Sequence, residues 1–305
     1  MQLHQLGYVM AVAEEQNFTR AAARLHLAQP SLSRQIGLLE RELGVQLFFR
    51  GHGAGPVELT GDGRALLPFI RRVLADVDAM TAEARALTGL TRGRLTIGAT
   101  PSLATRFLPS ALAAFHASYP QISLSVLEAG SRELTQRVAD GEVDLALVGA
   151  PNTHRMVTTT PLFEDRLVLA LPRGHPLARR RSVRVADLDG LAMVIFREGY
   201  DLRSTTLAAC QQAGVTPRLV SEGGEMDGII ALVAAGLGAA VIPELVVRPD
   251  DDIVARPFAR PGLSRTIEIA QRAGRPLSRA AQAMATALDA HAVATAAALH
   301  GPAAR

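Results

Sequence analysis

The chain has 305 residues, of which 48% are hydrophobic and 20% are charged, with no Trp and a single Cys. This composition indicates a globular protein with room for two or three domains, and it excludes a small disulfide-stapled scaffold. All basic residues are arginine, so almost nothing titrates between neutral pH and the isoelectric point near 9.7, and the net charge is only +3. The high isoelectric point therefore does not by itself indicate a nucleic-acid binder.

Cellular location is addressed by two features of the sequence. Cys210 is the only cysteine, so no internal disulfide can form, which favours a reducing compartment. The chain contains no apolar run of about 18 residues, and its first residues lack the cationic and apolar regions of a signal peptide. We expect a cytoplasmic protein that neither spans a membrane nor is secreted.

Helical periodicity dominates the first 60 residues. An apolar stripe predicts a first helix that ends near residues 15–17, and a second helix follows at 18–25 with Asn17 or Thr19 as its cap. A third helix is expected at 30–43, because Pro30 suits a first helical turn and Gly44 a C-terminal stop.

The third helix has one apolar face and one polar face. Leu32, Ile36, Leu39 and Leu43 recur at helical spacing and are expected to pack, whereas Ser31, Ser33 and Arg34 point elsewhere. A short helix, a three-residue turn and a longer helix with early polar positions form the helix-turn-helix arrangement, which places its second helix in the DNA major groove. The periodicity equally fits a helical hairpin with a solvated polar face.

Two further segments bear on the DNA interpretation. Residues 45–49 and 57–59 read as short strands around the glycine-rich turn GHGAGP, which predicts a β-hairpin wing. From Thr60, an expected N-cap, a long helix extends to about residue 90 with a heptad pattern. We expect this seam to dimerise, although it also fits packing on its own domain; its members are Leu66, Ile70, Val73, Val77, Met80, Ala84 and Leu87.

The remainder of the chain alternates strands and helices. Short, largely apolar strands are expected at 94–100, 122–129, 143–149, 165–171, 192–196 and 239–243. This pattern predicts an α/β region with parallel strands in two subdomains separated by a cleft. Plausible crossovers between the subdomains lie at Pro161 and at 256–265, and an Ala-rich helix is expected near the C-terminus.

Several strings resemble the LysR-type transcriptional regulators over essentially the whole chain. They are FTRAAARLHLAQPSLSRQIGLLERELGVQLFFR (18–50), ELTGDG (58–63), RGRLTIGAT (92–100), GEVDLALVG (141–149) and ALVAAGLGAAVIPE (231–244). The resemblance implies a winged helix-turn-helix at 1–60, a linker and dimerisation helix at 61–91, and a periplasmic-binding-protein-like effector domain at 92–300. Within that domain it implies subdomain I at 92–163 and 266–300, and subdomain II at 164–265.

The resemblance also implies function: a dimer, and further a tetramer, that binds DNA and responds to a small effector, with RNA polymerase as a possible partner and no cofactor. The DNA-contacting positions would be Gln29, Pro30, Ser31, Ser33 and Arg34, with Arg50 in the wing. Arg and Gln can bond base edges bidentately, and Ser can reach a base or a phosphate. The loop lacks the further Arg that is usual in this family's wing, which leaves minor-groove contact open.

The effector site would lie at strand ends of the two subdomains. The candidate residues are Thr100, Ser102, Gly149, Phe196, Arg203 and Ser204. Helix N-termini at strand ends attract anions, and Arg203 could clamp a carboxylate, so the effector could be a small carboxylate. Thr100 and Ser102 could instead only cap a helix, and Arg203 could be a surface residue.

Other function classes find less support. The sequence contains no HExxH, GxSxG or P-loop pattern; its His residues are scattered, it has a single Cys and it has no Lys. We therefore expect no enzyme and no metal site. Cys210 lies in an apolar helical stretch, as a core residue would. A solute receptor would have no use for the first 60 residues. A small-molecule-binding scaffold without specific DNA binding remains as the alternative.

Overall fold

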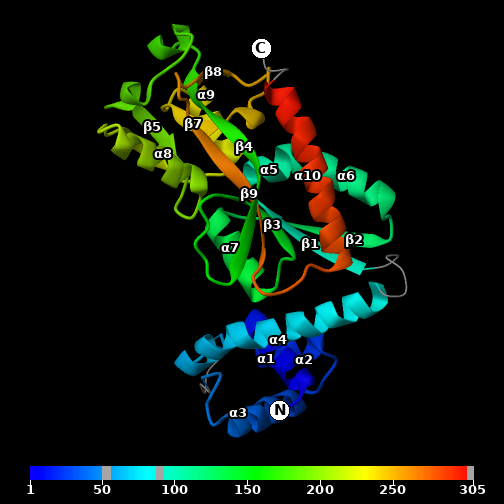
Figure 1. Ribbon diagram of the computed structural model, residues 1–305. Coiled ribbons are helices and arrows are strands. Elements are labelled where there is room, and N and C mark those ends of the chain that lie inside the picture. Colours follow the sequence, from blue (N-terminus) through cyan, green and yellow to red (C-terminus); the bar gives the residue numbers. More distant parts are fainter. Residues whose placement is uncertain (50–55, 87–92, 301–305) are drawn as a thin grey trace. The chain divides into compact units, whose positions relative to one another are not determined.

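The computed structural model describes residues 1–49, 56–86 and 93–300 (Figure 1). Within it the chain divides into two units, each packed around its own interior. The first consists mainly of Met1–Ala84, and the second contains most of Arg85–Arg305.

The first unit is helical. Its elements are α1 (Leu3–Glu15), α2 (Phe18–Arg24), α3 (Gln29–Leu43) and α4 (Gly61–Ala86). They enclose one apolar core, whose fully buried members include Val12, Leu32, Leu39 and Leu47. The predicted stripe of the first helix and the predicted packing face of the third helix thus meet in this core.

The helix ends follow the local signals in the sequence. The Asn17 side-chain oxygen accepts hydrogen bonds from the backbone N–H groups of Thr19 and Arg20, so Asn17 caps α2. Gly44 ends α3 in the left-handed conformation at φ 74°. Leu43, the last residue of α3, differs from the expectation that it packs: it is 38% exposed, because the core ends before the last turn of the helix.

The predicted wing is reduced in the described residues to one antiparallel bridge between Phe48 and Leu59, supported by a bond from Phe49 N to Glu58 O. The prediction of two strands at 45–49 and 57–59 is therefore wrong in extent, since the described residues there form a single bridge. The turn between them, including most of GHGAGP, lies outside the described residues. Thr60 caps α4 as expected, since its hydroxyl accepts a bond from Gly63 N.

The second unit contains a seven-stranded sheet in the order β2-β1-β3-β9-β4-β7, with β8 paired to β4, and a two-stranded β5-β6 sheet. The strands are β1 (Gly93–Ala99), β2 (Ile122–Glu128), β3 (Leu145–Gly149), β4 (Val157–Pro172), β5 (Ala192–Ile195), β6 (Arg218–Glu222), β7 (Ala240–Pro243), β8 (Ile253–Pro257) and β9 (Ser264–Arg272). All six predicted strands are present, but β6, β8 and β9 were not predicted.

The prediction of parallel strands is wrong for β4, β7, β8 and β9. β1 pairs in parallel with β2 and β3, whereas β9 pairs antiparallel with β3 and β4, and β4 pairs antiparallel with β7 and β8. The reason is the long β4–β9 ribbon, which runs through the whole unit (Figure 1). Its register shifts between Pro161 and Phe163, next to the predicted crossover at Pro161.

The two ends of this ribbon serve two lobes with separate cores. Lobe I contains β1–β3, the N-terminal part of β4 and the C-terminal part of β9. Lobe II contains the rest of β4 together with β5–β8. The helices of lobe I are α5 (Pro101–Arg106), α6 (Leu108–Ser118), α7 (Ser131–Asp140) and α10 (Arg279–His300). Those of lobe II are α8 (Asp201–Gln212), α9 (Met226–Ala234) and the short turns η1 (Pro176–Arg179), η2 (Val185–Leu188) and η3 (Glu244–Val246).

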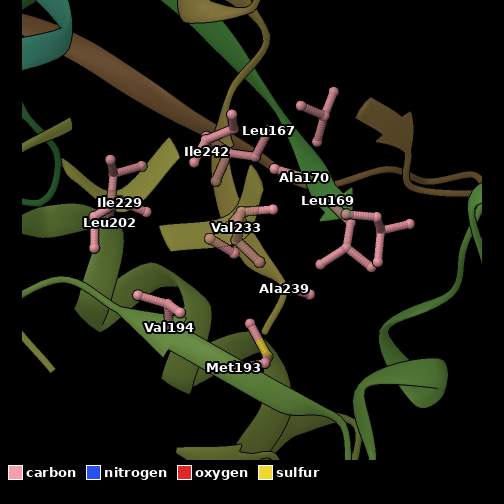
Figure 2. Packing of buried hydrophobic residues seen from close by; sticks show 14 of the residues in the cluster. Leu167, Leu169, Ala170, Met193, Val194, Leu202, Ile229, Val233, Ala239 and Ile242 are labelled. Atoms are coloured by element: carbon pink, nitrogen blue, oxygen red, sulfur yellow. The ribbon is translucent and has the colours of Figure 1, made fainter. Parts of the chain in front are cut away.

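The core of lobe II shows how these elements pack. Leu167 and Leu169 of β4 lie among Met193 of β5, Val233 of α9 and Ile242 of β7 (Figure 2). Cys210 of α8 belongs to the same cluster and is only 2% exposed, as expected of a core cysteine. No helix in the described part of the chain combines the length and apolarity needed to cross a bilayer.

Candidate DNA-binding face and effector region

The N-terminal end of α3 presents polar side chains to solvent. Gln29, Pro30, Ser31 and Arg34 are exposed, and Ser33 is half-buried. On the opposite face, Leu32 and Ile36 are buried in the core, which fixes the orientation of the helix. The arrangement leaves the first two turns of α3 free to approach a base edge.

Arg34 differs from the other arginines near it. Arg24 pairs with Glu14 at 2.7 Å and with Glu15 at 3.3 Å, and its hydrogen bond to Glu14 raises its pKa. Arg20 is held by Glu15. Within residues 1–49, 56–86 and 93–300, by contrast, Arg34 takes no hydrogen-bond or ion-pair partner, so its guanidinium is available to an external acceptor.

A buried carboxylate connects α3 to the wing. Glu40 is 6% exposed, and its Oε1 accepts bonds from the backbone N–H groups of Leu47 at 2.8 Å and Phe48 at 3.4 Å. This residue was not predicted from the sequence, because a Glu in a helix gives no periodic signal of burial. Arg50, the predicted wing contact, lies outside the described residues.

The predicted seam on α4 divides into two parts. Leu66 and Ile70 pack in the core of the first unit, as an amphipathic helix on its own domain would. Val73 is 43% exposed and Met80 is 67% exposed, and Ala84 is exposed and Val77 half-buried. Leu87 lies outside the described residues. Phe69, which the heptad pattern omitted, is 59% exposed and lies one turn before Val73.

In the effector region, the predicted residues of lobe I are buried. Thr100 is 2% exposed and Ser102 is 1% exposed. The Thr100 side chain does not cap α5, and its hydroxyl has no hydrogen-bond partner among the described residues. The Ser102 hydroxyl instead accepts a bond from Nη2 of Arg265 at 2.8 Å.

Arg265 is the centre of a buried ionic cluster, which lies where the β4–β9 ribbon passes from lobe I to lobe II. Asp165 lies directly opposite it in the β4–β9 register. Nε and Nη2 of Arg265 donate to Oδ2 of Asp165 at 3.0 and 2.8 Å, and Nη1 donates to Oδ2 of Asp201 at 2.7 Å. Burial raises the pKa of Asp165, while the charge of Arg265 opposes that rise.

Gly149 is drawn into the same cluster at the end of β3. Its backbone N–H donates to the Ser131 hydroxyl at 3.1 Å, and that hydroxyl donates to Oδ1 of Asp201 at 2.9 Å. A Cβ at Gly149 would lie 2.3 Å from Oδ2 of Asp201. Glycine is therefore required here by the close approach of a side chain from lobe II.

The predicted residues of lobe II do not join this cluster through their side chains. Arg203 donates from Nη1 to the backbone oxygen of Phe196 at 3.0 Å and pairs with Glu222 at 3.3 Å. The Ser204 hydroxyl donates to the backbone oxygen of Asp201. Arg203 thus already has partners within lobe II, and the structure gives no support to its predicted role as a carboxylate clamp.

Two family models match the chain. The bacterial regulatory helix-turn-helix of the LysR family matches residues 3–64, and the LysR substrate binding domain matches residues 88–293. The chain belongs to the LysR family. This LysR-family protein is therefore a DNA-binding transcriptional regulator with an effector-binding region, and its family is one of regulators rather than enzymes.

Similar proteins cover the LysR-family chain almost end to end. The transcriptional dual regulator GltC of Bacillus subtilis is 34% identical over 92% of this chain and 94% of its own. The DNA-binding transcriptional dual regulator OxyR of Escherichia coli is 31% identical over 95% of this chain and 97% of its own. Full-length CbnR complexed with its target DNA is 25% identical, with a TM-score of 0.71 over 97% of this chain and all of that chain.

The similarity includes another full-length structure. A variant of OxyR from Pseudomonas aeruginosa is 30% identical, with a TM-score of 0.75 over 94% of both chains. These matches confirm the predicted combination of a helix-turn-helix with a two-lobed α/β region.

Proposed function

We propose that the protein binds an imperfect palindrome as a dimer, with one α3 helix in each of two successive major grooves. Two-fold symmetry of this kind places recognition helices about one DNA turn apart. The single observation that carries the proposal is the exposed Arg34, which has no partner among the described residues and lies beside Gln29 and Ser31 at the start of α3. These residue types bond guanine and adenine edges or phosphates.

The dimer contact is assigned to the exposed apolar stripe of α4. Phe69, Val73 and Met80 recur on one side of the helix beyond the part that packs in the core. A partner helix would bury these side chains in the manner of a coiled coil. By family resemblance, dimers associate further into tetramers, and the regulator acts in the cytoplasm with RNA polymerase as its partner.

The effector region would act through its two lobes. A small molecule that binds one relation of the lobes better than another shifts their equilibrium, and this shift changes the spacing of recognition helices on DNA. A carboxylate effector would have to compete for Arg203 with Glu222 and the backbone oxygen of Phe196, which already bond its guanidinium. We therefore keep a small-molecule effector in the proposed function without that clamp.

Thiol-based sensing of peroxide, suggested by relatives named hydrogen peroxide-inducible genes activators, is not proposed. A peroxide-reactive cysteine needs an accessible thiolate. Cys210 is the only cysteine of the chain, it is 2% exposed, and burial raises its pKa. These properties describe an inert core thiol.

Selection of bound duplexes from a random DNA pool tests the proposal. We expect enrichment of a site with two related half-sites whose centres are about 10 bp apart. Enrichment of a single unrepeated motif would contradict the dimer geometry. Failure to enrich any sequence would favour the alternative of a binding protein without specific DNA recognition.

A further inference from the structure

The Asp201 carboxylate reaches from lobe II into lobe I. Asp201 is the first residue of α8, and its side chain is 7% exposed. Its oxygens take a bond from the Arg265 guanidinium at 2.7 Å and from the Ser131 hydroxyl at 2.9 Å. Ser131 begins α7 of lobe I and is held in turn by the backbone N–H of Gly149.

These groups form the type of surrounding that proteins build for a bound carboxylate. A guanidinium supplies charge-assisted hydrogen bonds, a hydroxyl supplies a second donor, and the site lies at a helix N-terminus beside a strand end. Here the bound carboxylate is part of the chain. We infer that Asp201 is a tethered occupant of this anion position, which excludes small carboxylates from it and joins the two lobes without a ligand.

Steric and electrostatic arguments both support exclusion. The side chain lies so close to the end of β3 that even a methyl group at Gly149 would approach Oδ2 of Asp201 to 2.3 Å. Two carboxylates, Asp165 and Asp201, already share the buried guanidinium of Arg265. A third carboxylate would meet net negative charge, so it could bind only by displacing Asp201.

The backbone next to Asp201 also contacts lobe I. Arg132 N of α7 donates to Gly199 O at 3.4 Å, and a Cβ at Gly130 would lie 2.7 Å from that same oxygen. The loop that precedes α8 therefore docks on the loop that precedes α7, and Asp201 supplies the ionic part of this contact. The consequence for regulation rests on the proposed function: the lobes would hold this relation until a ligand removes Asp201.

The test uses the full-length protein and formate, which has the size of the group that Asp201→Ala removes. Melting temperatures of wild type, Asp201→Ala and Asp201→Asn would be measured in sodium formate and in sodium chloride of equal ionic strength. Asp227→Ala serves as the matched control, because Asp227 is an exposed aspartate in the first turn of the neighbouring helix α9.

We expect Asp201→Ala to melt below wild type in chloride and to gain a saturable rise of at least about 2 °C in formate relative to chloride. Wild type, Asp227→Ala and Asp201→Asn should show no such rise, since an aspartate or an isosteric amide fills the position. Saturable stabilisation of wild type by formate would overturn the inference.

The inference would equally fail if Asp201→Ala ignored formate, or if it did not fold at any formate concentration, since Asp201 would then serve only packing. The melting experiment contains no DNA. Its failure therefore leaves the proposed DNA binding untouched, and failure of specific DNA binding would leave the formate result standing.

Discussion

Arg34 is exposed and has no hydrogen-bond or ion-pair partner among the described residues, so we expect specific DNA binding to depend on it. Of the arginines on α2 and α3, Arg20 and Arg24 are tied to acidic side chains of α1. Arg34 lies on the exposed side of α3, opposite the buried Ile36. Its guanidinium can therefore donate hydrogen bonds to a base edge or a phosphate in place of water.

Arg34→Ala should weaken binding to the cognate site by about 1–3 kcal/mol and relax specificity at the contacted base pair. Arg41→Ala is the matched control, because Arg41 is exposed in the last turn of the same helix. Fluorescence anisotropy with a selected site measures both. Equal losses for the two variants would show that Arg34 contributes only general positive charge.

The exposed positions at the start of α3 were predictable because exposure on a helix is a local property. The exposure of Gln29, Pro30 and Arg34 follows from helical periodicity within one helix. Asp201, Arg265 and Ser131 were missed, since the residues of their contacts are separated by 64 and 70 positions and no periodic pattern links them. Gly149 was among the predicted site residues, but the Asp201 side chain that requires a glycine there could not be inferred.

At the scale of elements, a buried acceptor holds the wing against α3. The Glu40 carboxylate accepts bonds from two consecutive backbone N–H groups, at Leu47 and Phe48, that no water can reach. Phe48 also forms the one described bridge of the wing. The Glu40 carboxylate therefore adds a hydrogen-bonded contact between α3 and the wing to the packing of Leu47 and Phe48 in the core.

Glu40→Ala should lower the free energy of unfolding of the first unit by about 1–3 kcal/mol, because two buried donors lose their acceptor. Glu42→Ala is the control, since Glu42 pairs with the N-terminal amine on the surface, where such pairs contribute little. Urea denaturation followed by circular dichroism measures both. An unfolding midpoint unchanged by Glu40→Ala would show that the wing is held by other contacts.

The exposed stripe of α4 makes a second prediction at this scale. Val73→Glu combined with Met80→Glu should raise the dissociation constant of the dimer more than about tenfold, because charges would enter an apolar seam. Val73→Leu with Met80→Leu keeps the stripe apolar and should preserve the dimer. Sedimentation equilibrium distinguishes the two outcomes, and a dimer unaffected by the glutamates would place the interface elsewhere.

The fully buried strand was predicted, and a strand with several polar residues was missed. β3 is fully buried and was found, whereas β6 has Arg, Ser and Glu among its five residues and was not. β9 alternates, with Ile267 and Ile269 buried, but its N-terminal part was read as a crossover. Because β9 was missed, the antiparallel β4–β9 ribbon and the mixed sheet could not be foreseen.

The molecule as a whole combines a DNA-reading unit with a two-lobed unit whose lobes are linked by an ionic cluster. The family match and the full-length neighbours support the combination of these two units. The buried charges at the β4–β9 crossover are where a ligand could alter the relation of the lobes, because removing one partner of a buried pair is strongly destabilising.

Specific DNA binding is the central claim, and one measurement tests it most directly. Purified protein would be titrated by fluorescence anisotropy against the duplex enriched by selection and against a scrambled duplex of the same composition at near-physiological salt. We predict binding at least about 10³-fold tighter to the selected duplex. Equally weak binding to both duplexes would contradict specific DNA binding.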